Sequence, residues 1–214
     1  MSSPNIVIVN IGTSNLFSVA RAVEQCGFHG SITSDPEDVR RADRVVLPGV
    51  GAFGEAMGRL TASGMADSLR ESASQGKPIL GICLGMQLLF DGSEEFGAYR
   101  GMSLVPGRVV SFPPPSQDGP RYKVPQIGWN TVSPARGVDW PGTIMEGQAT
   151  SSWFYFVHSF YCLPAQQSDI IGVTTYAELE YCSVVRRGHI WGCQFHPERS
   201  AKEGLRIYKK FLTY

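Results

Sequence analysis

Short runs of apolar and β-branched residues alternate with amphipathic stretches through the first half of the chain. The apolar runs, each long enough for one strand, occupy residues 5–11, 43–48 and 78–82. Runs without a polar face are typical of strands buried in a parallel sheet. Helical spacing of apolar residues follows from 16 to 23 and from 54 to 75, where Gly64 interrupts it. This alternation predicts an α/β fold with an open, mostly parallel sheet flanked by helices.

The second half has a different pattern and predicts an antiparallel extension of the sheet. Aromatic and β-branched runs, joined by short turns, occupy residues 153–161, 170–176, 182–186 and 189–195. Arg187-Gly188 is a candidate hairpin turn between the last two runs, and the proline-rich stretch 113–120 predicts a surface loop. The last segment places apolar residues on one face of a helix: Ala201, Leu205, Tyr208, Phe211 and Leu212. The loop is too short for a domain linker, so we expect one domain over residues 1–214.

Composition and charge exclude several classes of protein. Nineteen basic and nineteen acidic residues give a formal net charge of +0, which does not favour a nucleic-acid binder held by counterion release. No stretch approaches the ~20 apolar residues of a membrane span, and the first residues lack a signal peptide's charged region. The five cysteines are an odd number without a CxxC pair, which indicates neither a zinc site nor a disulfide framework. We expect a cytoplasmic protein without a metal or cofactor.

The most informative motif is Gly81-Ile82-Cys83-Leu84-Gly85, where a buried strand meets a helical stretch from 84 to 90. A nucleophile at such a junction needs a sharp turn, and small residues two positions away make room for it. The helix that begins after Cys83 directs free N–H groups at the sulfur and favours the thiolate. The alternative is a buried cysteine between two glycines that pack a helix. The position at a strand-to-helix junction favours the nucleophile.

A second motif, His196-Pro197-Glu198, follows the last predicted strand. Positions i and i+2 of extended chain point the same way, so the Glu198 carboxylate can reach the His196 imidazole. A carboxylate on one ring nitrogen leaves the other free as a base for a thiol. The alternative is a loop histidine with a solvated glutamate. Together with Cys83, the pair indicates a Cys-His-Glu triad.

A third motif, Pro48-Gly49-Val50-Gly51, ends another predicted parallel strand. Ligands of such sheets bind outside the carboxyl ends of the strands, so this loop belongs near the elbow. Its backbone N–H groups, those of Gly49 and Val50, could then stabilise an oxyanion together with the N–H of Leu84. The alternative is an ordinary glycine-rich turn. No Gly-Lys-Ser/Thr follows, so the motif is not a Walker loop.

Five motifs in this order resemble a known family. They are Leu-Pro-Gly-Val-Gly (47–51), Gly-Ile-Cys-Leu-Gly-Met-Gln-Leu-Leu (81–89), Ile-Gly-Trp-Asn (127–130), Tyr-Phe-Val-His-Ser (155–159) and Gln-Phe-His-Pro-Glu-Arg-Ser (194–200). The chain resembles the class I, triad-type glutamine amidotransferases, and among them the glutaminase subunits of imidazole glycerol phosphate synthases. The resemblance covers essentially the whole chain. It implies the fold of that family, with a nucleophile elbow.

The resemblance also implies an activity and assigns roles to residues. Cys83 attacks the side-chain amide of glutamine, His196 takes and returns the proton, and Glu198 orients His196. The resemblance places five further residues around the substrate's amino-acid head: Gly51, Gln87, Glu95, Ser159 and Phe160. No cofactor or metal is implied. Of the other aromatic-strand residues, His158 is interpreted as structural rather than catalytic.

The implied partner is a (β/α)8-barrel cyclase subunit in a heterodimer. It receives ammonia and makes imidazole glycerol phosphate and an aminoimidazole carboxamide ribonucleotide in histidine biosynthesis. We expect Trp129 to anchor the interface, the alternative being a core tryptophan. Gln126 stands where the family usually has histidine, and Asn10 and Ser14 replace an Asp- and Gly-containing loop. These departures lie near the expected interface. A paralogous subunit that feeds an amidino-sugar synthase, or a catalytically silent regulatory subunit, therefore remains an alternative.

Overall fold

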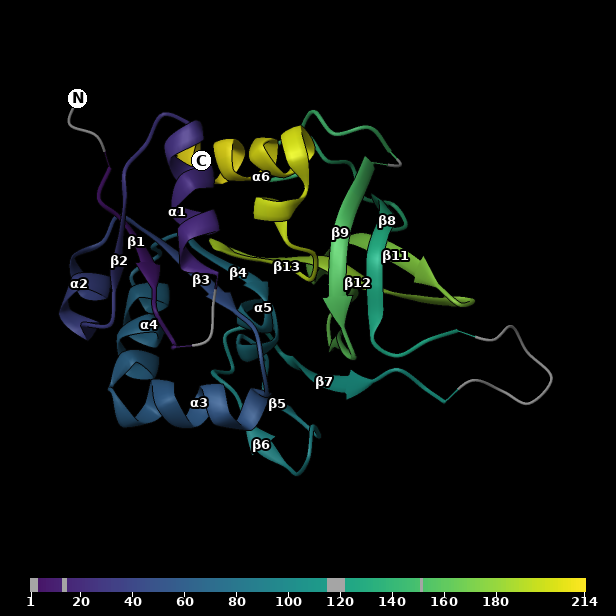
Figure 1. Ribbon diagram of the computed structural model, residues 1–214, viewed down its shortest axis with the longest axis horizontal. Coiled ribbons are helices and arrows are strands. Elements are labelled where there is room, and N and C mark those ends of the chain that lie inside the picture. Colours follow the sequence, from purple (N-terminus) through teal and green to yellow (C-terminus); the bar gives the residue numbers. More distant parts are fainter. Residues whose placement is uncertain (1–3, 13–14, 115–121, 151) are drawn as a thin grey trace.

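The computed structural model describes residues 4–12, 15–114, 122–150 and 152–214 (Figure 1). Its central sheet begins with five parallel strands. In spatial order they are β2 (Gly30–Thr33), β1 (Ile6–Val9), β3 (Arg44–Gly49), β4 (Ile79–Cys83) and β13 (Ile190–Cys193). These strands are largely buried, as the apolar runs predicted. Their carboxyl ends bring the segments around Gly49, Cys83 and His196 to one edge of the sheet.

The rest of the sheet is mainly antiparallel, as the second half of the sequence predicted. Beyond β13 the order continues through β12 (Leu179–Arg187), β10 (Phe160–Pro164), β7 (Gly107–Ser111), β5 (Gly92–Ser93) and β6 (Tyr99–Arg100). A branch from β12 leads through β11 (Ile170–Tyr176) to β8 (Gln126–Pro134) and β9 (Ser152–His158). We call the β8–β9 pair the ribbon. The hairpin predicted at Arg187-Gly188 joins β12 to β13, where Arg187 pairs with Ile190.

The run 153–161, predicted as one strand, is two strands separated at Ser159. β9 pairs with β8, whereas β10 pairs with β7 and β12. The aromatic run continues through the break, so composition gives no signal for it. The break arises from the two different sets of neighbours.

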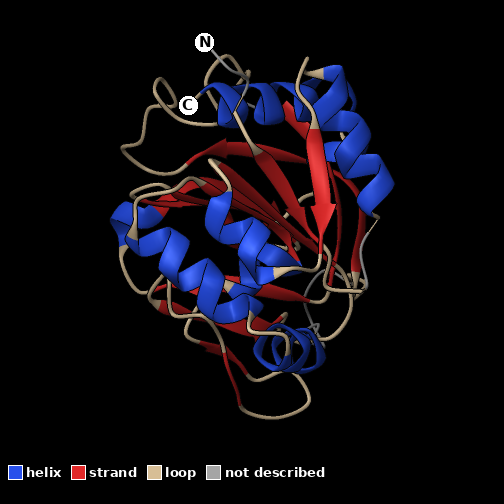
Figure 2. Ribbon diagram, turned by 90° about the vertical axis from the view of Figure 1, so that its left-hand side faces the viewer, coloured by secondary structure: helices blue, strands red, loops and turns tan. Residues whose placement is uncertain are grey.

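Helices cover both faces of the sheet (Figure 2). On one face lie α1 (Leu16–Gln25) and α6 (Ala201–Thr213), and on the other lie α2 (Pro36–Arg41), α3 (Phe53–Ala62), α4 (Met65–Ser74) and α5 (Leu84–Leu88). Two short 3₁₀ helices, η1 (Gln167–Asp169) and η2 (Pro197–Arg199), complete the helical elements of the described ranges. Alternate residues of β1 enter the two cores, Ile6 and Ile8 in one and Val7 and Val9 in the other.

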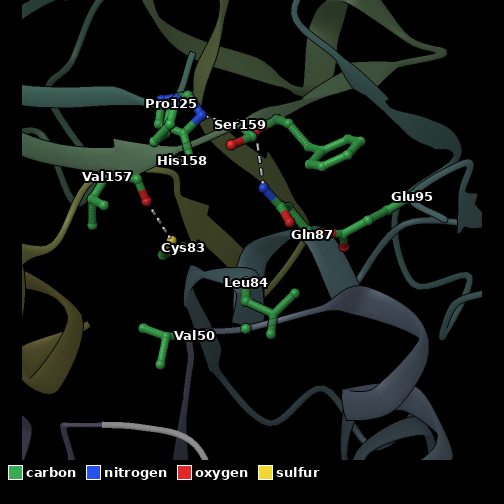
Figure 3. Close-up of a pocket in the computed structure, with 11 residues that line it drawn as sticks. Val50, Cys83, Leu84, Gln87, Glu95, Pro125, Val157, His158 and Ser159 are labelled. Atoms are coloured by element: carbon green, nitrogen blue, oxygen red, sulfur yellow. Dashed lines mark hydrogen bonds between the residues drawn. The ribbon is translucent and has the colours of Figure 1, made fainter.

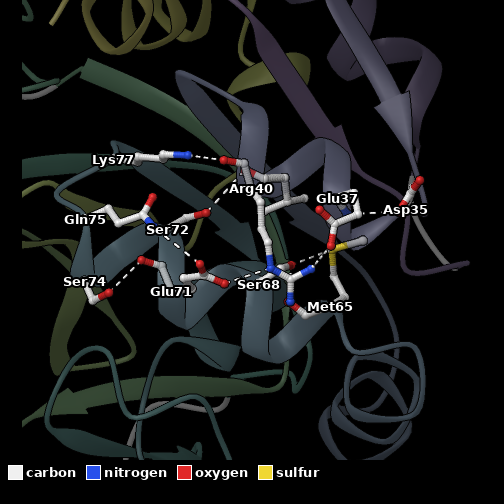
Figure 4. Close-up of polar contacts among 11 residues, drawn as sticks. Asp35, Glu37, Arg40, Met65, Ser68, Glu71, Ser72, Ser74, Gln75 and Lys77 are labelled. Atoms are coloured by element: carbon white, nitrogen blue, oxygen red, sulfur yellow. Dashed lines mark hydrogen bonds and ion pairs between the residues drawn. The ribbon is translucent and has the colours of Figure 1, made fainter.

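Helices α2 and α4 are joined by polar contacts (Figure 4). The Arg40 guanidinium bonds the Glu37 carboxylate at 2.5 Å and the Glu71 carboxylate at 2.8 Å. The Ser72 hydroxyl donates to the Val39 carbonyl at 3.3 Å. The ion pairs are partly exposed, so screening by solvent keeps the contribution of each to stability small. The packing of the two helices provides the rest of their stability.

The structure confirms the predicted interruption at Gly64 and corrects the buried face predicted for the last helix. The helical stretch 54–75 is two helices, and Gly64 between them has φ 74°, as the predicted interruption requires. Ala201, predicted on the buried face of the last helix, is exposed, and Gly204 and Ile207 belong to that face instead. Ser14 and residues 115–120 of the predicted loop lie outside the described residues.

No helix within the described ranges is long and apolar enough to cross a membrane. In the same ranges, no group of three or more His, Cys, Asp or Glu side chains could hold a metal ion.

Candidate active site

The elbow predicted at Cys83 is present where β4 meets α5. Cys83 has φ 54° and ψ −112°, a strained conformation for a residue with a side chain. A Cβ at Gly81 would lie 2.7 Å from the Gly85 carbonyl oxygen, and a Cβ at Gly85 would lie 1.8 Å from that of Leu47. Only glycine fits either position. The Gly-x-Cys-x-Gly pattern is therefore dictated by backbone contacts that hold the turn at Cys83.

His196 and Glu198 form the pair that their spacing predicted. The Nδ1 atom of His196 lies 2.8 Å from Glu198 Oε1, and both side chains are buried. The backbone of His196 is fixed too, because its N–H donates to the Tyr155 carbonyl at 2.9 Å and its carbonyl accepts from the Ser200 hydroxyl at 2.7 Å. Its Nε2 atom is buried without a hydrogen-bond partner among the described residues. That nitrogen is available to a reacting group.

Electrostatics favour a protonated His196. Burial lowers the pKa of the imidazole, but the charge of Cys83, followed by the hydrogen bond and charge of Glu198, outweighs burial and raises this pKa to about 10. The ring can therefore hold a proton taken from an attacking thiol until a leaving amine accepts it.

A cavity of about 310 Å³ opens beside Cys83 (Figure 3). Eight residues predicted for the site line it: Val50, Gly51, Cys83, Leu84, Gln87, Glu95, Ser159 and Phe160. The segment after β3, the end of β4, helix α5, the β5–β6 loop and the start of β10 thus converge on one space. The volume suits a small polar substrate rather than a large one.

The predicted oxyanion residues flank the nucleophile. Gly49 is the register partner of Cys83 on the neighbouring strand. Val50, which follows β3, and Leu84, the first residue of α5, both line the cavity. Gly49 and Val50 also line a second cavity of about 80 Å³, together with His196 and Glu198. The arrangement brings the residues that carry the predicted N–H donors to the same space as the sulfur.

Two predicted substrate-binding side chains are held in place by the protein. The Gln87 Nε2 group donates to the Phe160 carbonyl at 3.0 Å and to Gln194 Oε1 at 3.1 Å. The Glu95 Oε2 atom accepts from the backbone N–H of Phe53, the first residue of α3, at 2.7 Å. A carboxylate at a helix N-terminus is electrostatically favourable. Both side chains are therefore oriented before any substrate enters.

Sequence reasoning missed Gln194 and Val157 as neighbours of the nucleophile. Gln194 Nε2 donates to Cys83 Sγ at 3.7 Å, and the Cys83 thiol donates to the Val157 carbonyl at 3.8 Å. Gln194 is fully buried. A glutamine inside the apolar run that precedes His196 was the available signal, because a buried amide needs partners. Val157 contributes a backbone atom and left no signal in the sequence.

The two residues predicted at the partner interface differ in their surroundings. Trp129 on β8 is 51% exposed, which excludes the alternative of a core tryptophan. Gln126, the first residue of β8, is only 3% exposed, and its side-chain amide lies 2.9 Å from the Tyr181 hydroxyl oxygen. Its side chain lies on the inner face of the ribbon. Asn10, a departure from the family, accepts from the Gly12 N–H at 2.9 Å, a contact that an aspartate oxygen could also make.

The chain belongs to the class I glutamine amidotransferase family, whose family profile, "Glutamine amidotransferase class-I", matches residues 7–213. Within this family it is a glutamine amidotransferase subunit of the HisH group. It is 44% identical to the imidazole glycerol phosphate synthase subunit HisH of Syntrophotalea carbinolica over 207 residues, 96% of this chain and 98% of the relative. It is 43% identical to subunit HisH 1 of Legionella pneumophila over 209 residues, 97% and 98% of the two chains.

Solved structures share the fold at much lower identity. PurLQS from Thermotoga maritima has a TM-score of 0.71 at 19% identity, over 100% of this chain and 99% of that one. A crystal structure of a glutamine amidotransferase has a TM-score of 0.72 at 15% identity, over 98% of each chain. These likenesses confirm the predicted fold class.

Proposed function

We propose that this chain hydrolyses glutamine through Cys83, His196 and Glu198 and delivers the ammonia to a (β/α)8-barrel cyclase subunit. The observation that carries the proposal is the convergence of the strained Cys83 and the buried His196–Glu198 pair on one edge of the sheet, beside a cavity. Glutamine hydrolysis needs a nucleophile, a group that moves a proton, and a pocket for the amino-acid head. The residues around this cavity supply all three.

In the first step the Cys83 sulfur attacks the side-chain amide carbon of glutamine, and His196 holds the thiol proton. The N–H groups of Val50 and Leu84 stabilise the oxyanion that forms; one such donor typically contributes about 3 kcal/mol. The carbon–nitrogen bond then breaks, and His196 returns its proton to the leaving ammonia. A γ-glutamyl thioester on Cys83 remains.

In the second step water attacks the thioester, and His196 accepts a proton from that water. Glutamate leaves and the Cys83 thiol is restored. Glu198 keeps His196 oriented in both steps through the 2.8 Å contact with Nδ1. The amino-acid head binds at the opposite part of the cavity, against Gly51, Gln87, Glu95, Ser159 and Phe160.

The outer face of the ribbon is the surface that fits the partner. Ile127 is 63% exposed, Trp129 51% and Trp153 57%. The strand register places all three on the same face, because Ile127 pairs with Val157, and Trp153 pairs with Thr131, two residues from Trp129. Val157 lines the cavity at Cys83. The exposed apolar face therefore runs to the reaction site, which suits a partner that receives ammonia.

The relatives favour the histidine-pathway synthase as the partner over an amidino-sugar synthase. The products would then be imidazole glycerol phosphate and an aminoimidazole carboxamide ribonucleotide. We also propose a cytoplasmic location, which is supported by five cysteines that are all free and buried.

The test is a coupled assay with the purified chain and a barrel cyclase subunit of this pathway. We expect glutamate release from glutamine, with ammonia appearing in imidazole glycerol phosphate when the cyclase substrate is present. Cys83→Ala should abolish both, while externally added ammonia still supports the cyclase. Glutamate release that supports only an amidino-sugar synthase would identify the paralogous partner. The absence of hydrolysis with either partner would refute the proposal and identify the chain as catalytically silent.

A further inference from the structure

A buried chain of hydrogen bonds leads from the first residue of the ribbon to the strand beside the substrate cavity. Gln126 on β8 pairs directly with His158 on β9, so their side chains share the inner face of the ribbon. The Tyr181 oxygen from β12 lies 2.9 Å from Gln126 Oε1 and 3.2 Å from His158 Nε2. His158 Nδ1 lies 2.8 Å from the Phe160 carbonyl oxygen. All three side chains are buried.

Counting protons fixes the direction of these bonds at His158. A carbonyl oxygen only accepts, so the bond to Phe160 requires a proton on His158 Nδ1. Burial lowers the pKa of His158 to about 4, so the ring is neutral at pH 7 and carries one proton only. Nε2 is therefore a bare acceptor, and the proton between it and Tyr181 comes from the tyrosine hydroxyl.

The same count of protons determines which end of the Gln126 amide faces Tyr181. Burial raises the pKa of Tyr181 well above its ordinary value, so the hydroxyl keeps its single proton. That proton goes to His158 Nε2, so it cannot also serve an oxygen of Gln126 or of Thr174, the other side chain that hydrogen-bonds Tyr181. The Gln126 amide satisfies the contact only when its NH₂ group, in place of Oε1, faces the tyrosine oxygen and donates to it. Every bond then runs one way, from Gln126 to Tyr181 to His158 to the Phe160 carbonyl.

The Phe160 carbonyl joins this chain to the groups around the nucleophile. It also accepts from Gln87 Nε2, which donates to Gln194 Oε1, and Gln194 Nε2 donates to Cys83 Sγ. Gln87 and Phe160 both line the substrate cavity. The orientation of this peptide therefore influences the wall against which the substrate's amino-acid head is proposed to bind.

The geometry points to Gln126, Tyr181 and His158 as positioning residues of the glutaminase site, joined in a one-way relay that holds the Phe160 carbonyl. This inference rests on the proposed function for its kinetic consequence. Because the relay acts on the binding wall and not on the reacting atoms, its loss should raise KM for glutamine more than it lowers kcat.

Nitrogen NMR of the full chain with labelled histidine tests the proton count, and the signal of His158 is identified by its loss in His158→Gln. At pH 7.5 we expect the proton on Nδ1 and a bare, hydrogen-bonded Nε2. Tyr181→Phe should shift the Nε2 signal toward that of a free acceptor. Tyr176→Phe is the matched control, because it removes a hydroxyl that bonds the Lys123 carbonyl from the same aromatic cluster. A proton on Nε2 in the wild-type chain would overturn the relay.

Kinetics with the barrel partner test the positioning role. Losing one buried hydrogen bond should raise KM in Tyr181→Phe by about fivefold to tenfold, with kcat changed less and Tyr176→Phe unchanged. Gln126→Met should raise KM as well, and the double variant should be no worse than Tyr181→Phe alone, since both act through one chain of bonds. Additive effects, or a lowered melting temperature with an unchanged KM, would refute the role. A wild-type complex without glutaminase activity would refute the proposed function, while the NMR result would still stand or fall separately.

Discussion

His196 owes its unusual protonation to two side chains that lie on different elements. Glu198 follows it by two residues in η2, whereas Cys83 ends β4, the strand that pairs with β13 directly before His196. Removing either should shift the pKa of His196 downward, because both stabilise the charged ring. The Glu198 contribution is the one that can be removed without removing the nucleophile.

We therefore predict a shift in the pH profile of Glu198→Gln. The leaving ammonia needs a proton from His196, so kcat/KM in the native chain should fall only as the pH rises towards about 10. In the variant the alkaline fall of kcat/KM should begin at least one pH unit lower. One unit corresponds to a loss of about 1.4 kcal/mol in the stabilisation of the protonated ring. Glu203→Gln is the control, since Glu203 forms an exposed pair with Arg206 on α6. An unchanged alkaline limb in Glu198→Gln would contradict the assigned role of this carboxylate.

The pKa of His158 is lowered in the folded chain, whereas that of His196 is raised, and this leads to a prediction about stability at acidic pH. Its pKa is about 4 in the folded chain and about 6.5 when unfolded, so the unfolded chain binds more protons between these values. The free energy of unfolding should therefore decrease as the pH falls through this window, by about 2.5 kcal/mol at pH 4.5 from this residue alone. Urea unfolding at pH 7.5 and 4.5 measures it. His158→Gln should show a correspondingly smaller difference between the two pH values; an equal difference would contradict the neutral buried ring.

At the scale of residues, the sequence predicted the side chains that short motifs mark. Cys83, His196 and Glu198 were indicated by glycine spacing and an i, i+2 pair. The contacts of Gln194 and His158 could not be predicted, because their partners come from strands far away in the chain. Gln126 was expected near the partner interface. It is buried because Tyr181 and His158 supply polar partners inside the ribbon.

At the scale of elements, β3, β4 and α5 form one rigid support for the nucleophile. The Gly85 Cα approaches the carbonyl of Leu47 on β3, so the first turn of α5 lies against the neighbouring strand. This contact keeps Cys83 in its strained conformation.

We predict that Gly85→Ala is severely destabilising. The added Cβ would lie 1.8 Å from the Leu47 oxygen, and backbone must move to relieve it. The cost should be about 3 kcal/mol or more in the free energy of unfolding, with loss of glutaminase activity. Gly58→Ala on α3 is the matched control: no atom lies within 4 Å of its added Cβ, and alanine should stabilise the helix by about 0.5–1 kcal/mol. Equal stabilities of the two variants by urea unfolding would contradict this account of the elbow.

Helices with a regular spacing of apolar residues and strands with a continuous apolar run were predicted well. They include the parallel strands of the core and the two helices that Gly64 separates. The prediction failed where tertiary pairing decides the structure. The break at Ser159 exists because β9 leaves the main sheet to pair with β8. β2 is a short edge strand with exposed central residues, so it lacks the apolar signal that revealed its neighbours.

At the scale of the whole molecule, the exposed face of the ribbon is the feature that hydrolysis alone does not explain. Three large apolar side chains there, Ile127, Trp129 and Trp153, are more than half exposed. Faces of this kind mark interaction surfaces. That residues 1–214 act as one domain stays a prediction.

Trp129→Ala should weaken the complex with the barrel subunit by about 2 kcal/mol or more, roughly thirtyfold in Kd. Because the Trp129 side chain is 51% exposed, the melting temperature of the variant should differ little from that of the native chain. Ile32→Ala is the control, an exposed apolar residue on the edge strand β2. Titration calorimetry and thermal unfolding measure the two quantities. An unchanged Kd would contradict the role of Trp129 as an anchor of the interface.

The central claim is that Cys83 carries the glutamyl group. Its most direct test is mass spectrometry of the chain after treatment with a glutamine-derived electrophile, which reacts where the amide carbon of glutamine would be attacked. We predict a single adduct on the peptide that contains Cys83, prevented by excess glutamine and absent in Cys83→Ser. The other four cysteines should stay unmodified, because they are buried and, unlike Cys83, do not line the described cavity at the elbow. An adduct on another cysteine, or one that forms equally fast in Cys83→Ser, would contradict the account.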